Sequence, residues 1–280
     1  MFGEIKAKLR SRLERLYQRF HNLLFLASSF DPLQFPRRYR RPEDQELAAF
    51  FAASLAYGHI QQIRRSVESL LARMGDSPHR FVLSFDPRRD AGCFEGFVHR
   101  FNTGLDFAVL CSLLRQVLER HGSLGDYFLL GYRASDEDVG PALIRFVEGI
   151  LSLESTPFYP KGVLPGGAGV RFLLPSPAQG SACKKLNLFL RWMVRKDELD
   201  LGLWWRVSPA KLITPIDTHV LNFCQQHGLT RLKTPSWRMA QEITRHFREL
   251  NPEDPIKYDF AISHYGMGQE SGVRWINGRG

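Results

Sequence analysis

The sequence predicts an all-α protein, and three observations support this prediction. Apolar residues recur at three- and four-residue steps through nearly every long segment, which is typical of amphipathic helices. Proline, glycine and small polar residues gather between those segments, where helices start and stop. No internal repeat is present, and a short strand is expected only near residues 170–174.

The first half of the chain indicates a series of helices. An N-terminal segment carries leucines at helical spacing with Lys and Arg between them, and the Pro- and Arg-rich stretch 31–42 that follows indicates a connector. Pro42 with the acids after it favours a helix start, and Gly58 interrupts the apolar helix that they open. The helices expected in this half span residues 2–27, 46–57, 60–74, 106–121, 123–131 and 137–152.

The second half begins with a stretch that excludes a long helix. Residues 155–180 are rich in proline and glycine and predict a loop. Helical spacing then returns, and the helices expected here span 184–195, a segment from Thr218, residues 235–250 and a segment from Pro255.

Composition and charge limit the classes of function. The net charge of +9 suits a polyanionic partner, either nucleic acid or a membrane surface, although a basic protein without such a partner is an alternative. The longest N-terminal apolar run, Leu23–Ala27, is too short for a signal peptide or a membrane span, so we expect a cytoplasmic protein. The four cysteines are scattered without a CxxC pair, so neither a zinc site nor an iron–sulfur cluster nor another cofactor is expected.

Two segments contain the residues expected to carry chemistry. Gly180-Ser181-Ala182-Cys183 is a small-residue turn that leads into an apolar helix and leaves backbone N–H groups able to hold a phosphate. Lys184 and Lys185 follow in the first helical turn, where cations oppose the helix dipole. A solvated pair of surface lysines is the alternative interpretation.

The second segment is Pro215-Ile216-Asp217-Thr218-His219-Val220. Asp217 precedes a helix at the usual position of an N-cap, and a plain cap is one interpretation. A capping carboxylate is also rigid and ionised, which suits a residue that faces a developing cation.

Together the two segments resemble the helix-hairpin-helix DNA glycosylase superfamily, which includes endonuclease III and the 8-oxoguanine glycosylases. Gly180 and Lys184 have the spacing of the family's hairpin glycine and catalytic lysine, and Asn187 matches an asparagine of endonuclease III. The separation of 33 residues between Lys184 and Asp217 is similar to that of the archaeal 8-oxoguanine glycosylases. The chain also resembles a bacterial protein family that carries SACK-LNLFLRWMVR and PIDTHV segments, a resemblance that implies no particular activity.

The glycosylase resemblance implies two helical subdomains that flank a cleft, which we expect to be residues 1–44 plus 205–280 and residues 45–204, with the hairpin near 175–195. It implies a monomeric, nucleoid-associated DNA N-glycosylase with AP-lyase activity on double-stranded DNA that carries a damaged base, 8-oxoguanine being favoured. Lys184 is the expected nucleophile, with Lys185 as its competitor, and Asp217 is the expected carboxylate. The residues expected to contact DNA are Tyr57, which would fill the vacated space, and Gly180, Ser181, Ala182, Lys185 and Arg191.

Some features depart from the family or leave other functions open. Ala182 replaces the second hairpin glycine. The segment from Phe260 to Gly266 resembles the helix of endonuclease III that runs into its iron–sulfur cysteines, but no cysteines follow Gly266 in this sequence. A DNA-structure-binding relative without catalytic activity would keep salt-sensitive DNA binding and form no covalent complex. A helical protein-interaction module would bind no DNA at moderate salt.

Overall fold

The computed structural model describes residues 2–270, and over this range the chain is mostly helical, as predicted. The α-helices are α1 (Phe2–Phe20), α2 (Leu23–Ser28), α3 (Pro42–Ser54), α4 (Ile60–Arg73), α5 (Pro78–Leu83), α6 (Pro87–Asp90), α7 (Gly104–His121), α8 (Leu124–Gly131), α9 (Gly140–Leu151), α10 (Val170–Leu173), α11 (Lys184–Val194), α12 (Thr218–Gln226), α13 (Trp237–Arg248) and α14 (Asp259–Glu270). Short 3₁₀ turns are η1 (Pro32–Gln34), η2 (Pro36–Arg38), η3 (Ala91–Phe94), η4 (Pro177–Gln179) and η5 (Pro209–Lys211). Strands β1 (Val98–His99) and β2 (Asn102–Thr103) form one antiparallel hairpin.

Three local predictions were wrong. The first is that no strand was expected outside 170–174, whereas β1 and β2 lie within 98–103. The strand expected near 170–174 is the helical turn α10, so a short apolar run was assigned the wrong period. The helix expected over 2–27 is divided, because the Asn22 side chain accepts a hydrogen bond from Phe25 N and starts α2 afresh.

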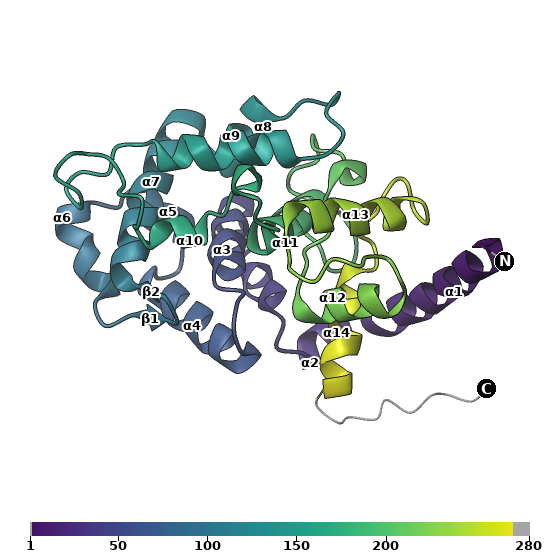
Figure 1. Cartoon of the computed structure of the whole chain (residues 1–280). Coiled ribbons are helices and arrows are strands. Elements are labelled where there is room, and N and C mark those ends of the chain that lie inside the picture. The colour runs from purple at the N-terminus through teal and green to yellow at the C-terminus, as the bar shows by residue number, and fades with distance from the viewer. Residues whose placement is uncertain (1, 271–280) are drawn as a thin grey trace.

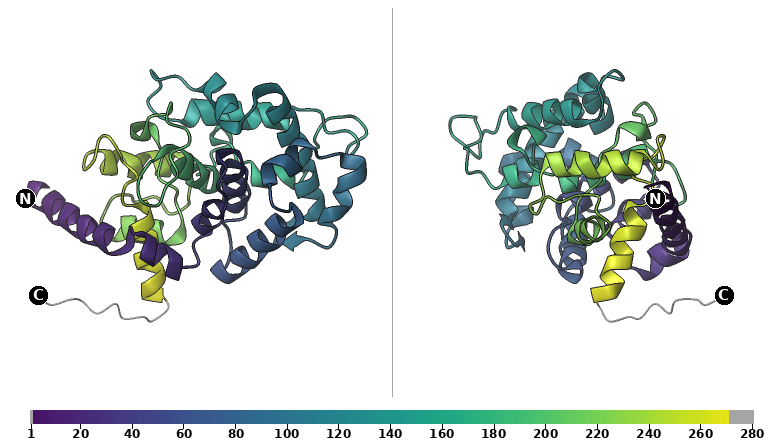
Figure 2. Two further views of the ribbon diagram at one scale, coloured as in Figure 1. Left: turned by 180° about the vertical axis from the view of Figure 1, so that it is seen from behind. Right: turned by 45° about the vertical axis from the view of Figure 1, so that its right-hand side comes forward.

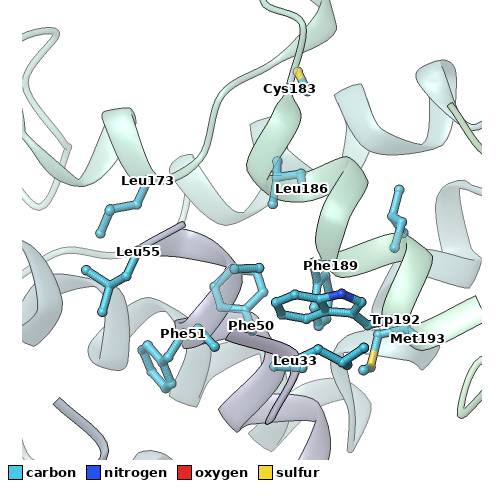
Figure 3. Close-up of a cluster of buried hydrophobic side chains, with 14 of the residues drawn as sticks. Leu33, Phe50, Phe51, Leu55, Leu173, Cys183, Leu186, Phe189, Trp192 and Met193 are labelled. Carbon is cyan, nitrogen blue, oxygen red and sulfur yellow. The ribbon is translucent and has the colours of Figure 1, made fainter. Parts of the chain in front are cut away.

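Helices α3 and α11 pack against each other at the centre of the molecule (Figure 1). Eight successive residues of α3, from Leu47 to Ser54, are buried, so this helix is enclosed on all sides. The Phe50 ring of α3 meets the Phe189 ring of α11 edge to face, with centroids 5.2 Å apart. Figure 3 shows the surrounding apolar side chains, which include Leu55, Leu186 and Trp192. This packing fixes the position of the first turn of α11, which carries both lysines.

A second packing unit joins the two ends of the chain. Helix α14 packs on both α12 and α1, and α1 projects from the end of the molecule opposite α5, α6 and α7 (Figures 1 and 2). Lys257 binds Glu14 at 2.9 Å and helps hold α14 to α1. Because α12 and α14 lie side by side, Asp217 at the head of α12 is brought close to α14.

The described part of the chain gives two further results on organisation. Its buried apolar residues form one cluster that extends from α1 to α14. The division into subdomains 1–44 plus 205–280 and 45–204 stays a prediction. Among the helices of residues 2–270, none combines the length and apolar composition that crossing a bilayer requires.

Candidate active site

Lys184 and Asp217 line the same pocket, which has a volume of about 70 Å³. The pocket lies where the loop after α3, the start of α11, the head of α12 and one face of α14 meet. Its remaining lining consists of Asp31, Pro32, Ala56, Ile60, Ile63, Leu188, Arg191, Pro215, Asp259, Phe260, Ser263 and Met267. Two side chains that are distant in the sequence therefore share one cavity.

Lys184 is held at the pocket by the backbone of the loop after α3. Its half-buried side chain donates a hydrogen bond of 2.9 Å from Nζ to the carbonyl oxygen of Ala56. Among residues 2–270, no carboxylate forms an ion pair with Lys184, although it shares its pocket with three aspartates. The amine is thus oriented by a neutral acceptor, and Asp217 lies beyond the range of a direct ion pair.

The turn before Lys184 has the backbone that a tight bend requires. Gly180 has φ +73° and Cys183, the residue that precedes α11, has φ +49°, so both are left-handed. Asn187 secures the bend, because its side-chain amide donates a hydrogen bond of 3.0 Å to the carbonyl oxygen of Ala182. Gly180 also accepts a bond of 3.0 Å from Trp237 N.

Asp217 is the N-cap of α12, as predicted from its position. Its Oδ1 accepts a hydrogen bond of 2.7 Å from Val220 N, and its Oδ2 accepts one of 2.5 Å from the Ser263 hydroxyl of α14. Both carboxylate oxygens are therefore fixed, while their remaining lone pairs stay available to the pocket. The two hydrogen bonds therefore fix the orientation of this carboxylate at the pocket.

The floor of the pocket belongs to a buried ion network. Arg191 binds Asp259 at 2.8 Å and Asp200 at 3.3 Å, and the neighbouring Arg195 binds Asp200, Asp254 and Asp197. Two guanidinium groups thus face four carboxylates, and one of these, Asp197, also lies 2.8 Å from His21 Nε2. Burial raises the pKa of Asp259 to about 7. The negative charges of Asp217 and Asp200 also raise this pKa, whereas the positive charge of Arg191 lowers it.

Asp31 closes the pocket from the N-terminal side. Its carboxylate caps η1 through Leu33 N and accepts a hydrogen bond of 3.0 Å from His264 Nε2. Burial alone would raise the pKa of Asp31, but the His264 and backbone hydrogen bonds outweigh burial and hold the pKa below its ordinary value. A fixed anion here adds to the negative field at the pocket.

Comparison with protein-family models assigns the chain to a family, and the match includes the pocket. A family model described as "Protein of unknown function (DUF2400)" matches residues 31–268, which include every residue that lines the pocket. The chain belongs to the DUF2400 family. Neither the search of curated proteins nor the search of solved structures found a match to this DUF2400 protein.

Lys185 of this DUF2400 protein points away from the pocket that Lys184 lines. Its ammonium group donates a hydrogen bond to the carbonyl oxygen of Phe172 and lies over the rings of Phe172 and Tyr57, 3.9 and 5.0 Å from their centroids. Burial, together with the neighbouring charge of Lys184, lowers the pKa of Lys185 to about 7. A side chain with only 7% of its surface exposed does not suit the DNA contact predicted for it.

The structure places the other predicted DNA-contact residues in different environments. Gly180 is exposed and Ser181 half-buried, as a contacting turn requires, whereas Ala182 is buried. Arg191 is only 2% exposed and is held by two carboxylates, a position that does not suit the predicted DNA contact. Tyr57 is half-buried, and its hydroxyl donates to Asn102 Oδ1 at 2.7 Å and to the carbonyl oxygen of His99 at 3.0 Å, so it is not free to fill a vacated space.

Sequence reasoning did not predict Asp31, Asp259 and Ser263 as site residues of this DUF2400 protein. Asp31 had a detectable signal, because Asp before Pro is a frequent helix start. Asp259 and Ser263 had none, since only the packing of α14 on α12 brings them to Asp217. Across the described residues, His, Cys, Asp and Glu side chains form no group of three able to hold a metal ion.

Proposed function

We propose that this protein is a DNA N-glycosylase with AP-lyase activity, built on a helix-hairpin-helix glycosylase-like fold. The observation that supports the proposal is the shared pocket of Lys184 and Asp217. A glycosylase with lyase activity needs two groups at one cavity. One is a lysine amine, which forms a bond to the sugar carbon that carried the base, and the other is a fixed carboxylate, which stabilises the positive charge on the sugar. The substrate is double-stranded DNA with a damaged base, extruded from the stack before reaction.

Asp217 acts on the first half of the reaction. The bond between the sugar C1′ and the base nitrogen breaks, and the base leaves with the electron pair. The sugar then carries positive charge, which the carboxylate of Asp217 stabilises at close range. Val220 N and Ser263 hold that carboxylate in place, so little reorganisation is needed when the charge forms.

Lys184 acts on the second half. Its neutral amine adds to C1′ and loses a proton, and opening of the sugar ring gives a Schiff base. Loss of a proton from C2′ then expels the 3′ phosphate by β-elimination, which cuts the strand, and water releases the lysine. The carbonyl oxygen of Ala56 holds the amine at the pocket through a hydrogen bond of 2.9 Å. Asp259, with a pKa near 7, is a pocket group able to exchange protons at neutral pH.

The turn before Lys184 has the features of a phosphate contact. Gly180 and Ser181 are accessible, and within residues 2–270 the backbone N–H groups of Ser181 and Ala182 donate no hydrogen bond. Free N–H groups before a helix start attract an anion, and the net charge of +9 favours DNA in general. The element before this turn is η4, a single 3₁₀ turn, where the glycosylase family has a full helix.

The substrate and the setting extend the same proposal. The separation of 33 residues between Lys184 and Asp217 favours 8-oxoguanine as the damaged base. We expect a monomer that acts on nucleoid DNA in the cytoplasm.

Borohydride trapping tests the proposal. The protein is incubated with duplexes that each contain one lesion, 8-oxoguanine among them, and borohydride reduces any Schiff base to a stable covalent complex. Wild type should be trapped, Lys184→Gln should not, and Asp217→Asn should be trapped at a rate lower by about 10²–10³. Absence of trapping by wild type on every lesion, together with salt-sensitive DNA binding, would support a DNA-binding relative without catalytic activity instead.

A further inference from the structure

The β1–β2 hairpin ends in an exposed phenylalanine, Phe101. His99 pairs with Asn102, so Arg100 and Phe101 are the two residues of the turn. Phe101 is 68% exposed although it is a large apolar side chain, and the Arg100 guanidinium lies 5.3 Å from its ring centroid. Phe101 shares this exposure with a second aromatic ring, that of Phe172, so the two together form an apolar surface that a partner can contact.

The hairpin is anchored firmly to the loop that borders the pocket. Its inward-facing residues, His99 and Asn102, are both fully buried. Asn102 Oδ1 accepts the Tyr57 hydroxyl at 2.7 Å, and His99 Nε2 lies 3.1 Å from the carbonyl oxygen of Tyr57. His99 Nδ1 lies 2.8 Å from the Ser66 hydroxyl of α4, which fixes the hairpin from a second side. The tip is therefore held in one position relative to the loop.

The same loop touches both the tip and the catalytic lysine. Ala56 accepts the hydrogen bond of Lys184, and two residues later Gly58 packs against Arg100 so closely that an added Cβ would lie 2.8 Å from Arg100 Cδ. The left-handed backbone of Gly58, with φ +99°, makes this approach possible. Residues 56–58 therefore connect the hairpin tip to the rim of the pocket, since Ala56 lines the pocket and Gly58 contacts Arg100.

Phe101 does not stand alone on this surface. Its ring meets that of Phe172, which is 44% exposed, with centroids 5.7 Å apart. Phe172 in turn lies against Tyr57 and covers the buried Lys185. An exposed aromatic ring with an arginine beside it, on a protein of net charge +9, fits a nucleic acid base stacked on the ring and a phosphate near the guanidinium.

We infer that Phe101 at the hairpin tip inserts into the base stack of bound DNA, next to the nucleotide that enters the pocket, while Arg100 contacts the adjacent phosphate. Tyr57 supports the hairpin and makes no insertion of its own. The inference rests on the proposed DNA substrate and assigns the inserting residue within it. Stacking is strongest where the duplex already has a gap, because no base must be displaced there.

The test uses a duplex with a single tetrahydrofuran abasic analogue, which has no aldehyde and cannot form a Schiff base, and an intact duplex of the same sequence. Fluorescence anisotropy gives the affinity of the full-length protein for each. Phe101→Ala should bind the abasic duplex about 5- to 150-fold more weakly, and Phe101→Trp should bind it as wild type does. Val98→Ala, on an equally exposed apolar side chain of the same hairpin, is the matched control and should stay within about twofold of wild type.

Circular dichroism and a thermal melt of each variant establish that it is folded. Equal binding by folded Phe101→Ala and wild type would overturn the inference, while trapping in the separate borohydride assay would still support the proposed function. Phe101-dependent binding without trapping by wild type would support the inference and overturn the glycosylase proposal. Wild-type protein that binds neither duplex at low salt would overturn both.

Discussion

Replacement of the buried Lys185 by methionine should stabilise the protein at neutral pH. The wild-type amine has no carboxylate partner among residues 2–270 and lies between two aromatic rings. Burial lowers its pKa from 10.5 to about 7, and each pKa unit corresponds to about 1.4 kcal/mol. The charged amine is therefore less stable inside the fold than in water by about 5 kcal/mol.

Methionine avoids that cost but loses the hydrogen bond to the Phe172 carbonyl oxygen, which offsets about 1–3 kcal/mol. The net gain expected for Lys185→Met at pH 7 is about 2–4 kcal/mol in the free energy of unfolding. The gain should shrink as pH rises. Between pH 7 and 10.5 the unfolded chain holds a proton on Lys185 that the folded chain has lost, so the stability of wild type increases with pH in this window.

Urea denaturation of both proteins at several pH values from 6.5 to 9.5 measures the effect. Lys185→Arg is the matched control, because a guanidinium keeps its charge throughout this range and should be less stable than wild type by an amount that grows with pH. A Lys185→Met variant that is less stable than wild type at pH 7, or whose stability difference does not change with pH, would refute this electrostatic description of the residue.

Two further substitutions test how the site is supported. Gly58→Ala should lower the free energy of unfolding by about 1–3 kcal/mol, since φ is +99° and the new Cβ would displace Arg100; a urea midpoint equal to that of wild type would contradict this. Trp204→Phe should cost about 1–3 kcal/mol, because it removes the 2.7 Å hydrogen bond to the buried carboxylate of Glu46, which also accepts Leu124 N and Gly125 N. Trp204→His, which can keep a donor, should lose less in the same assay, and an equal loss in both variants would show that lost packing is the cause.

The sequence was informative where local pattern determines structure. The capping position of Asp217 and the tight turn before Lys184 follow from residue types that act within a few positions, and both were predicted. The helical spacing likewise located the main helices.

Tertiary contacts decided the rest. Arg191 of α11 and Arg195 just after it are buried against aspartates of residues 197–200 and 254–259, which no pattern within α11 can indicate. The β1–β2 hairpin has two residues in each strand, too few to show a period of two. The inserting role of Tyr57 was implied by the glycosylase resemblance alone, and the hydrogen bonds of its hydroxyl to His99 and Asn102 could not be read from the sequence.

The most direct test of the central claim is to locate the covalent bond on the protein. After borohydride trapping on the preferred lesion, the complex is digested and tandem mass spectrometry identifies the modified lysine. The reduced sugar adduct should be on Lys184, the lysine that lines the pocket with Asp217, and Lys185→Met should still be trapped. An adduct on Lys185, or on a lysine outside this pocket, would contradict the assignment of Lys184 and Asp217 as the reacting pair.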